Sequence, residues 1–109
     1  MIFTVQMIAN YDKGKVREVD VPDQMAESAS DDELLQSIFK YGQNDFQPQQ
    51  VYSVSVGDVI NLRDELWIVA PLGFKQITQE QFDKLPGNLT QHHDLYWNFL
   101  YNDKELPNA

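Results

Sequence analysis

Three adjacent residues carry the side chains most often used for metal binding or proton transfer: His92, His93 and Asp94. Histidine ionises near neutral pH, and histidine and aspartate are common metal ligands. Neighbouring side chains point about 100° apart on a helix and to opposite faces on a strand, so the two histidines cannot readily share one ion. No further ligand follows at a metal-site spacing. We therefore expect a surface position near a helix start, with no catalytic residue, no metal site and no cofactor.

The corner Gly57-Asp58 offers a second candidate group, a carboxylate at a turn within an apolar stretch. Such a carboxylate would hold a ligand if it were positioned at a binding corner. Glycine also adopts positive φ with little strain, and aspartate side chains bond to nearby turn amides. We favour this structural role, in which the corner folds a sheet.

Acidic residues are concentrated in the N-terminal half. The chain has 17 Asp and Glu against 8 Lys and Arg, a formal charge of −9, and residues 18–39 contain no Lys or Arg. Nucleic-acid affinity comes largely from cations that displace counterions, so we expect no direct nucleic-acid binding. This acidic face either solubilises the protein and complements a helix dipole, or mimics the phosphate path of DNA. Its candidate residues are Asp20, Asp23, Glu27, Asp31, Asp32 and Glu33.

An aromatic segment near the C-terminus is the candidate for protein contacts. Its large side chains cannot all be buried on one side of a single helix, so we expect some exposed aromatic surface. Exposed Trp and Tyr side chains anchor protein interfaces. We therefore predict that a protein partner, or a second copy in a homodimer, binds at Tyr96, Trp97, Phe99 and Tyr101.

The elements that position these groups begin with a hairpin. Apolar and polar residues alternate over residues 2–9, a turn composition follows at 10–14, and residues 15–21 return as a second strand that Pro22 ends. Residues 22–30 are small and polar, which is typical of a connector.

A helix is predicted over about residues 31–41. Ser30 and Glu33 form a capping box, in which the hydroxyl accepts the Glu33 amide and the carboxylate reaches back to the Ser30 amide. Apolar residues then recur on one face, and Gly42 is placed to end the helix in the left-handed region.

The stretch 51–78 predicts a curled antiparallel meander, because short apolar runs alternate with turn residues at 51–55, 59–62, 66–70 and 74–77. Thr78 and Gln81 form a second capping box and open a short helix that runs through Leu85. A helix and an aromatic-rich strand both fit residues 94–101. The predicted fold class is α+β: a curled antiparallel sheet or small, partly open barrel with an N-terminal hairpin, one amphipathic helix and one or two short C-terminal helices.

Length and composition favour one domain over residues 1–109 with a frayed tail at 102–109, since 42% of the residues are hydrophobic. The sequence has no cysteine, no signal-peptide pattern and no apolar run of membrane-spanning length. We therefore expect a soluble, cytoplasmic protein without membrane contact.

One motif resembles a known family. SVSVGDVI (53–60), followed by LWIVAPLGF (66–74), is similar to the Ser-Leu-Ser-Val-(Ser/Gly)-Asp-Val-(Val/Ile), aromatic strand and Gly-Phe pattern of YodL-like domains. The resemblance covers residues 51–78 and implies a setting in phages, plasmids or conjugative elements. Trp67 and Pro71-Leu72 depart from the Tyr-rich strand and the following residue of that pattern. The Val-Gly-Asp corner has a looser likeness to PUA and ASCH barrels, which bind RNA or modified bases.

The predicted function is that of a non-enzymatic accessory protein of a phage or other mobile element that acts through protein–protein contacts. The alternative is an acidic DNA mimic that inhibits a nucleic-acid-binding enzyme.

Overall fold

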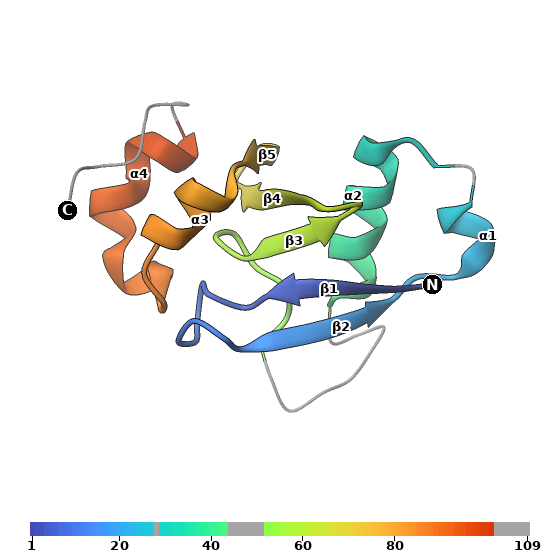
Figure 1. Ribbon diagram of the computed structural model, residues 1–109, viewed down its shortest axis with the longest axis horizontal. Helices are drawn as coiled ribbons and strands as arrows, with labels where there is room; N and C mark the ends of the chain where they lie inside the picture. Colours follow the sequence, from blue (N-terminus) through green and yellow to red (C-terminus); the bar gives the residue numbers. More distant parts are fainter. Residues whose placement is uncertain (28, 44–51, 102–109) are drawn as a thin grey trace.

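The computed structural model describes residues 1–27, 29–43 and 52–101, and it has an α+β fold built on one antiparallel sheet (Figure 1). The sheet has five strands in the order β2-β1-β3-β4-β5 and does not close, so the fold is the open-sheet form of the predicted class. The strands are β1 (Ile2–Gln6), β2 (Val16–Asp20), β3 (Val59–Leu62), β4 (Glu65–Ala70) and β5 (Gly73–Ile77).

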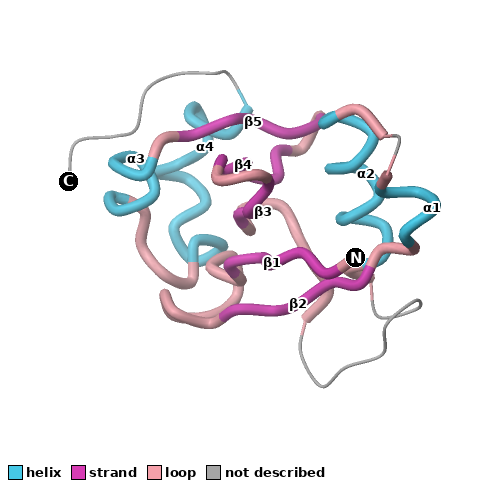
Figure 2. The backbone as a smooth tube through the Cα atoms, turned by 45° about the vertical axis from the view of Figure 1, so that its right-hand side comes forward, coloured by secondary structure: helices cyan, strands magenta, loops and turns pink. Residues whose placement is uncertain are grey.

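Helices lie on both sides of the sheet, as Figure 2 shows. Successive side chains of a strand point to opposite faces. Ile60 therefore packs in a core with α2 (Asp31–Tyr41), while its neighbour Val59 packs in a second core with α4 (His93–Tyr101). The helices are α1 (Asp23–Ala26), α2 (Asp31–Tyr41), α3 (Gln79–Lys84), the 3-10 turn η1 (Leu89–His92) and α4 (His93–Tyr101).

The predicted helix at 31–41 is confirmed as α2, with differences at both ends. The Ser30 hydroxyl accepts a hydrogen bond from the Glu33 amide, as predicted. The Glu33 carboxylate, however, accepts a hydrogen bond of 3.0 Å from the Ser30 hydroxyl and not from the Ser30 amide. Gly42 ends the helix with φ −78°, which is right-handed, so the expected left-handed end is wrong. Glycine is required there by packing, because an added Cβ would collide with the Val54 side chain.

Two further predictions are corrected: the connector at 22–30, and the strand at 51–55, of which residue 51 lies outside the described residues. Residues 23–26 form the short helix α1, in which the Ala26 amide donates to the Pro22 carbonyl at 3.2 Å and Asp23 of the first turn complements the helix dipole. Residues 52–55 are not a strand, because loop contacts use their backbone amides. The Tyr52 amide donates to the Tyr11 hydroxyl at 3.0 Å, and the Val54 amide donates to the Gly42 carbonyl at 3.2 Å.

The C-terminal elements follow the predicted order. The capping box of Thr78 and Gln81 is present at the start of α3. Residues 93–101 form a helix, which decides between the two alternatives for the aromatic segment. Within the described ranges, no helix is both long and apolar enough to cross a membrane. The predicted tail at 102–109 lies outside the described residues.

Candidate functional site

A groove with a mostly apolar lining runs between α2 and the hairpin formed by β4 and β5, and its volume is about 390 Å³. We call it the α2–β5 groove. The helix contributes side chains at positions 32, 36 and 39, which share one face because they are spaced by four and three residues. The lining residues are Asp32, Gln36, Phe39, Val56, Val69, Ala70, Pro71, Gly73 and Phe74.

The apolar character of the groove comes from both walls. Phe39 of α2 and Phe74 of β5 meet edge to face, with 6.4 Å between ring centroids. Val56 is 39% exposed, and Leu72, which lies between two lining residues at the hairpin tip, is 98% exposed. Aliphatic and aromatic surface of this kind is stabilised when another molecule removes it from water.

Strand β5 forms one edge of the sheet (Figure 2). Its residues Gly73 and Phe74 line this groove. It pairs with β4, with Val69 opposite Phe74, and no described strand lies beyond it. The outer N–H and C=O groups of an edge strand can pair with another chain. Lys75 turns to the opposite face, where its Nζ lies 4.2 Å from the centroid of the Phe99 ring. An apolar groove and a backbone edge therefore lie side by side.

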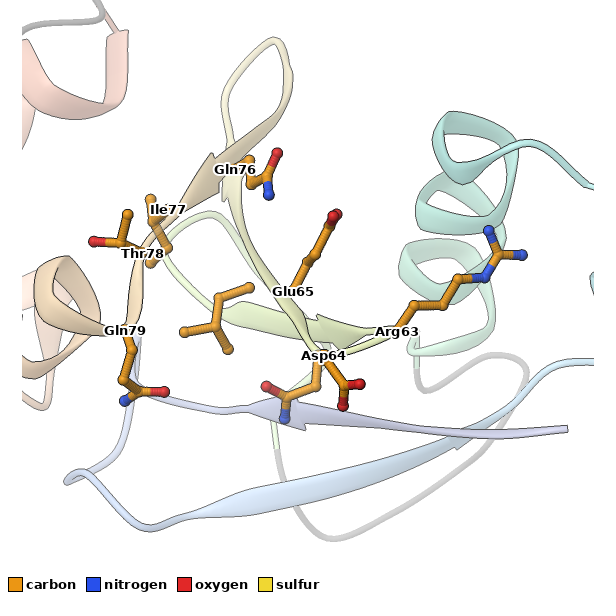
Figure 3. Close-up of a pocket in the computed structure, with 9 residues that line it drawn as sticks. Arg63, Asp64, Glu65, Gln76, Ile77, Thr78 and Gln79 are labelled. Carbon is orange, nitrogen blue, oxygen red and sulfur yellow. The ribbon is translucent and has the colours of Figure 1, made fainter.

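A second, polar hollow of about 450 Å³ lies between the β3–β4 turn and the start of α3 (Figure 3). The Arg63 side chain points toward α2, where it pairs with Asp31. Asp64 and Glu65 are exposed, and the described residues of this lining include no histidine or cysteine. The hollow offers hydrogen bonds but no acid–base group shielded from water. Its lining residues are Asn61, Arg63, Asp64, Glu65, Leu66, Gln76, Ile77, Thr78 and Gln79.

The histidine segment lies at the surface, as predicted. His92 and Asp94 are exposed and line a hollow of about 430 Å³, and its described lining residues lie at positions 90 to 95. The side chain of His93 is outside the described part of the structure. Among residues 1–27, 29–43 and 52–101, no cluster of three or more His, Cys, Asp or Glu side chains is arranged to hold a metal ion. The described lining of this hollow therefore comes from neighbouring residues of η1 and α4, with no described residue from elsewhere in the chain.

The corner at Asp58 has the structural role predicted from the sequence. Its Oδ1 accepts the Ala9 amide at 2.9 Å, its Oδ2 accepts the Ser55 amide at 2.8 Å, and Gly57 has φ +99°. Burial raises the pKa of the Asp58 carboxyl to about 6, although the two amide hydrogen bonds and the nearby Arg17 charge lower it. Both carboxylate oxygens accept hydrogen bonds from backbone amides, so Asp58 links the segment after β1 to the loop before β3.

Part of the predicted aromatic interaction surface is buried. Tyr96 is 5% exposed and Phe99 is 1% exposed, and both pack in the core between the sheet and α4. The expectation of exposure is therefore wrong for these two residues, because the helix turns them toward Ile68 and its neighbours. The side chains of Trp97 and Tyr101 are outside the described part of the structure, and their predicted role stays a prediction.

The predicted acidic face is largely engaged within the chain. Five of its six carboxylates accept hydrogen bonds from other groups of the protein, and Glu27 is exposed. The pairs are Asp20 and Asp23 with the Met1 ammonium group, Asp31 with Arg63, Asp32 with Gln36, and Glu33 with Ser30. These carboxylates therefore hold local structure at the chain start and around α2.

Sequence reasoning did not identify the α2–β5 groove. Phe39 belongs to a helical stripe and Phe74 to a short strand, and no local pattern indicates that they meet. One usable signal is Leu72, an apolar residue at a tight turn, where Gly, Asn, Asp, Pro and Ser are usual.

Known proteins add no further constraint on the site. Comparison of the chain with family models, with curated proteins and with solved structures finds no match. The resemblance of residues 51–78 to YodL-like domains stays a prediction from the motif.

Proposed function

We propose that this protein is a non-enzymatic interaction protein that binds a partner protein through the α2–β5 groove. The observation that carries the proposal is an apolar groove directly beside the sheet edge β5, with Leu72 exposed at the hairpin tip. Apolar surface is stabilised by being covered, and edge backbone groups are stabilised by pairing. A polypeptide can do both at once, which favours a protein partner over a small ligand.

Binding is favoured over catalysis by the state of the ionisable groups. Active sites usually bury their acid–base groups and so perturb their pKa values. His92 and Asp94 are exposed. Among the described carboxyl groups, Asp58 is the one whose pKa burial raises strongly, and it accepts backbone amides instead of lining a described hollow. These features support a binding role for the described surface.

The proposed setting is a phage or other mobile element, in which the protein would act as an accessory factor. The motif at residues 53–60, with the Gly-Phe strand at 73–74, supports this setting through its resemblance to YodL-like domains. The groove and the setting are independent parts of the proposal, and each has its own support.

The acidic DNA mimic remains the alternative proposal. Its support is the formal charge of −9 and the absence of Lys and Arg from residues 18–39. The intramolecular bonds of Asp20, Asp23 and Asp31 weigh against it, because a mimic presents its carboxylates to a basic groove on its target.

The test is capture of host proteins by wild type and by two tryptophan variants. Gln36→Trp places a large ring in the groove from an exposed helix position, and Gln24→Trp is the matched control on exposed α1 surface outside the groove lining. Captured proteins are identified by mass spectrometry, purified and bound again to each variant. Circular dichroism melts verify that both variants fold as the wild type does.

The proposal predicts a protein that wild type and Gln24→Trp retain equally and that Gln36→Trp retains at least about tenfold less well. Equal retention of that protein by Gln36→Trp would contradict the proposal. The acidic mimic would be supported instead if Gln36→Trp still retained the protein while Asp23→Asn and raised salt each abolished its retention.

A further inference from the structure

We propose that the partner enters the α2–β5 groove as an extended segment, which pairs with β5 and places a lysine or arginine side chain against Asp32. The inference rests on the proposed function and adds the conformation and charge of the partner. Three features carry it: the backbone edge of β5, the alternation of side chains around that edge, and the charge of the first turn of α2.

The backbone edge favours an extended partner. β5 presents five residues, Gly73–Ile77, and its inner side is paired with β4. A strand added to the outer side would bond with the remaining N–H and C=O groups, which is a recurrent mode of peptide recognition. A helical partner would leave those groups unpaired, because the backbone groups of a helix bond to one another.

Side-chain alternation determines which partner residues reach the groove. In an added strand every second side chain points toward α2, where Phe39 and Phe74 meet at a centroid distance of 6.4 Å. The intervening side chains point toward α4, where the Lys75 Nζ donates to the Phe99 carbonyl at 3.3 Å. Apolar residues at alternate positions, separated by polar ones, therefore suit the two faces of the site.

The charge of the groove favours a basic residue. Asp32 is the one ionisable residue among the described residues of the lining, and Asp31 and Glu33 belong to the same helical turn. Arg63 pairs with Asp31, and the helix dipole adds only about half a positive charge, so this turn remains net negative. A second copy of the chain is a poorer occupant, because each copy carries a formal charge of −9.

The test uses three labelled heptapeptides whose binding is followed by fluorescence anisotropy at physiological salt. The first probe is Lys-Thr-Leu-Thr-Leu-Thr-Lys, which reads the same in both directions and so presents Lys and Leu on one face in either strand orientation. The second, Lys-Thr-Thr-Leu-Leu-Thr-Lys, has the same composition and charge but breaks the alternation. The third, Glu-Thr-Leu-Thr-Leu-Thr-Glu, reverses the charge.

Two protein variants localise the charge effect. Asp32→Asn removes the groove carboxylate, and Asp83→Asn is the matched control in α3. Each wild-type carboxylate is exposed and accepts a glutamine amide four residues away at 2.9 Å. Both variants remove one negative charge from the protein, so a general attraction of cationic peptides would weaken to the same extent in both.

We expect the first probe to bind at least about tenfold more tightly than either of the others. Asp32→Asn should weaken it about two- to fivefold, as for one exposed ion pair, and Asp83→Asn should leave it unchanged. The inference is overturned if the second probe binds as tightly as the first, if both Asn variants bind equally, or if the first probe fails to bind. It is also overturned if wild type sediments as a dimer that Gln36→Trp dissociates, since a second copy would then occupy the groove.

The two levels of proposal fail in different ways. If a host protein is captured through the groove but the probe peptides fail to bind, only the inference that the partner segment is extended and basic is overturned. Capture that does not depend on the groove would overturn the proposed function as well.

Discussion

The Oδ1 atom of Asp58 accepts a hydrogen bond of 2.9 Å from the backbone amide of Ala9, which lies 49 residues earlier in the chain. The other carboxylate oxygen accepts the Ser55 amide, so one buried side chain joins the loop before β3 to the segment after β1. This joint holds together strands that are distant in sequence but adjacent in the sheet. It also makes part of the stability depend on pH.

The contribution of Asp58 to the stability of the protein should decrease as the pH rises from about 4 to 7. Its pKa is about 6 in the folded protein against an ordinary 3.8, so the folded state binds the proton more tightly than the unfolded state. Proton binding by Asp58 therefore adds up to about 3 kcal/mol to the free energy of unfolding. This stabilisation is fully present below about pH 3.8 and is lost as the pH rises through about 6. Urea unfolding at pH 4.5 and pH 7 measures it.

Asp58→Asn is the control for this titration. The asparagine does not ionise, so the free energy of unfolding should vary less between pH 4.5 and 7 in the variant than in wild type. The variant should also lose about 1 to 3 kcal/mol through one unsatisfied amide, because its NH2 group cannot accept from Ala9 or Ser55. An unchanged pH dependence would contradict the account, and if the variant does not fold, carboxyl ¹³C NMR of wild type gives the pKa directly.

Gly87→Ala should destabilise the protein by roughly 1 to 3 kcal/mol, the usual range for overpacking. A Cβ at position 87 would lie 2.7 Å from both the Asp12 Cα and the Lys13 nitrogen, so the backbones would have to separate. Thermal unfolding measures the effect. Thr90→Ala, a substitution at an exposed position, is the comparison. Equal stability of the two variants would show that this close approach does not exist.

Phe99→Ala should cost about 3 to 5 kcal/mol because Phe99 is 1% exposed in the core under α4. Leu95→Ala, one turn earlier and 57% exposed, should change the free energy of unfolding by less than about 1 kcal/mol. Denaturant midpoints measure both, with Phe99→Leu as a milder variant. A cost for Phe99→Ala no larger than that for Leu95→Ala would contradict the buried position of Phe99.

Elements with local signals were predictable. Ser30 marks the start of α2, and Thr78 and Gln81 cap α3. The turn residues on either side of the apolar run 59–62 give the bounds of β3. These features depend on hydrogen bonds and side-chain spacing within a few residues, so the sequence contains them directly.

Features that depend on distant contacts were not predictable. The exposure of Tyr96 and Phe99 depends on which face of α4 meets the sheet, and a nearly uniform apolar segment does not encode that face locally. The α2–β5 groove requires Phe39 to meet Phe74, 35 positions later in the numbering. The candidate site therefore became visible only once the strand order and the placement of α2 were known.

Hydrogen–deuterium exchange of the protein, alone and with its captured partner, tests the central claim most directly. The account predicts that bound partner slows exchange at the amides of β5, which gain hydrogen bonds from the added strand, and reduces exchange in the first turns of α2. Slower exchange confined to β2 or to α4, with β5 unchanged, would contradict binding at the α2–β5 groove.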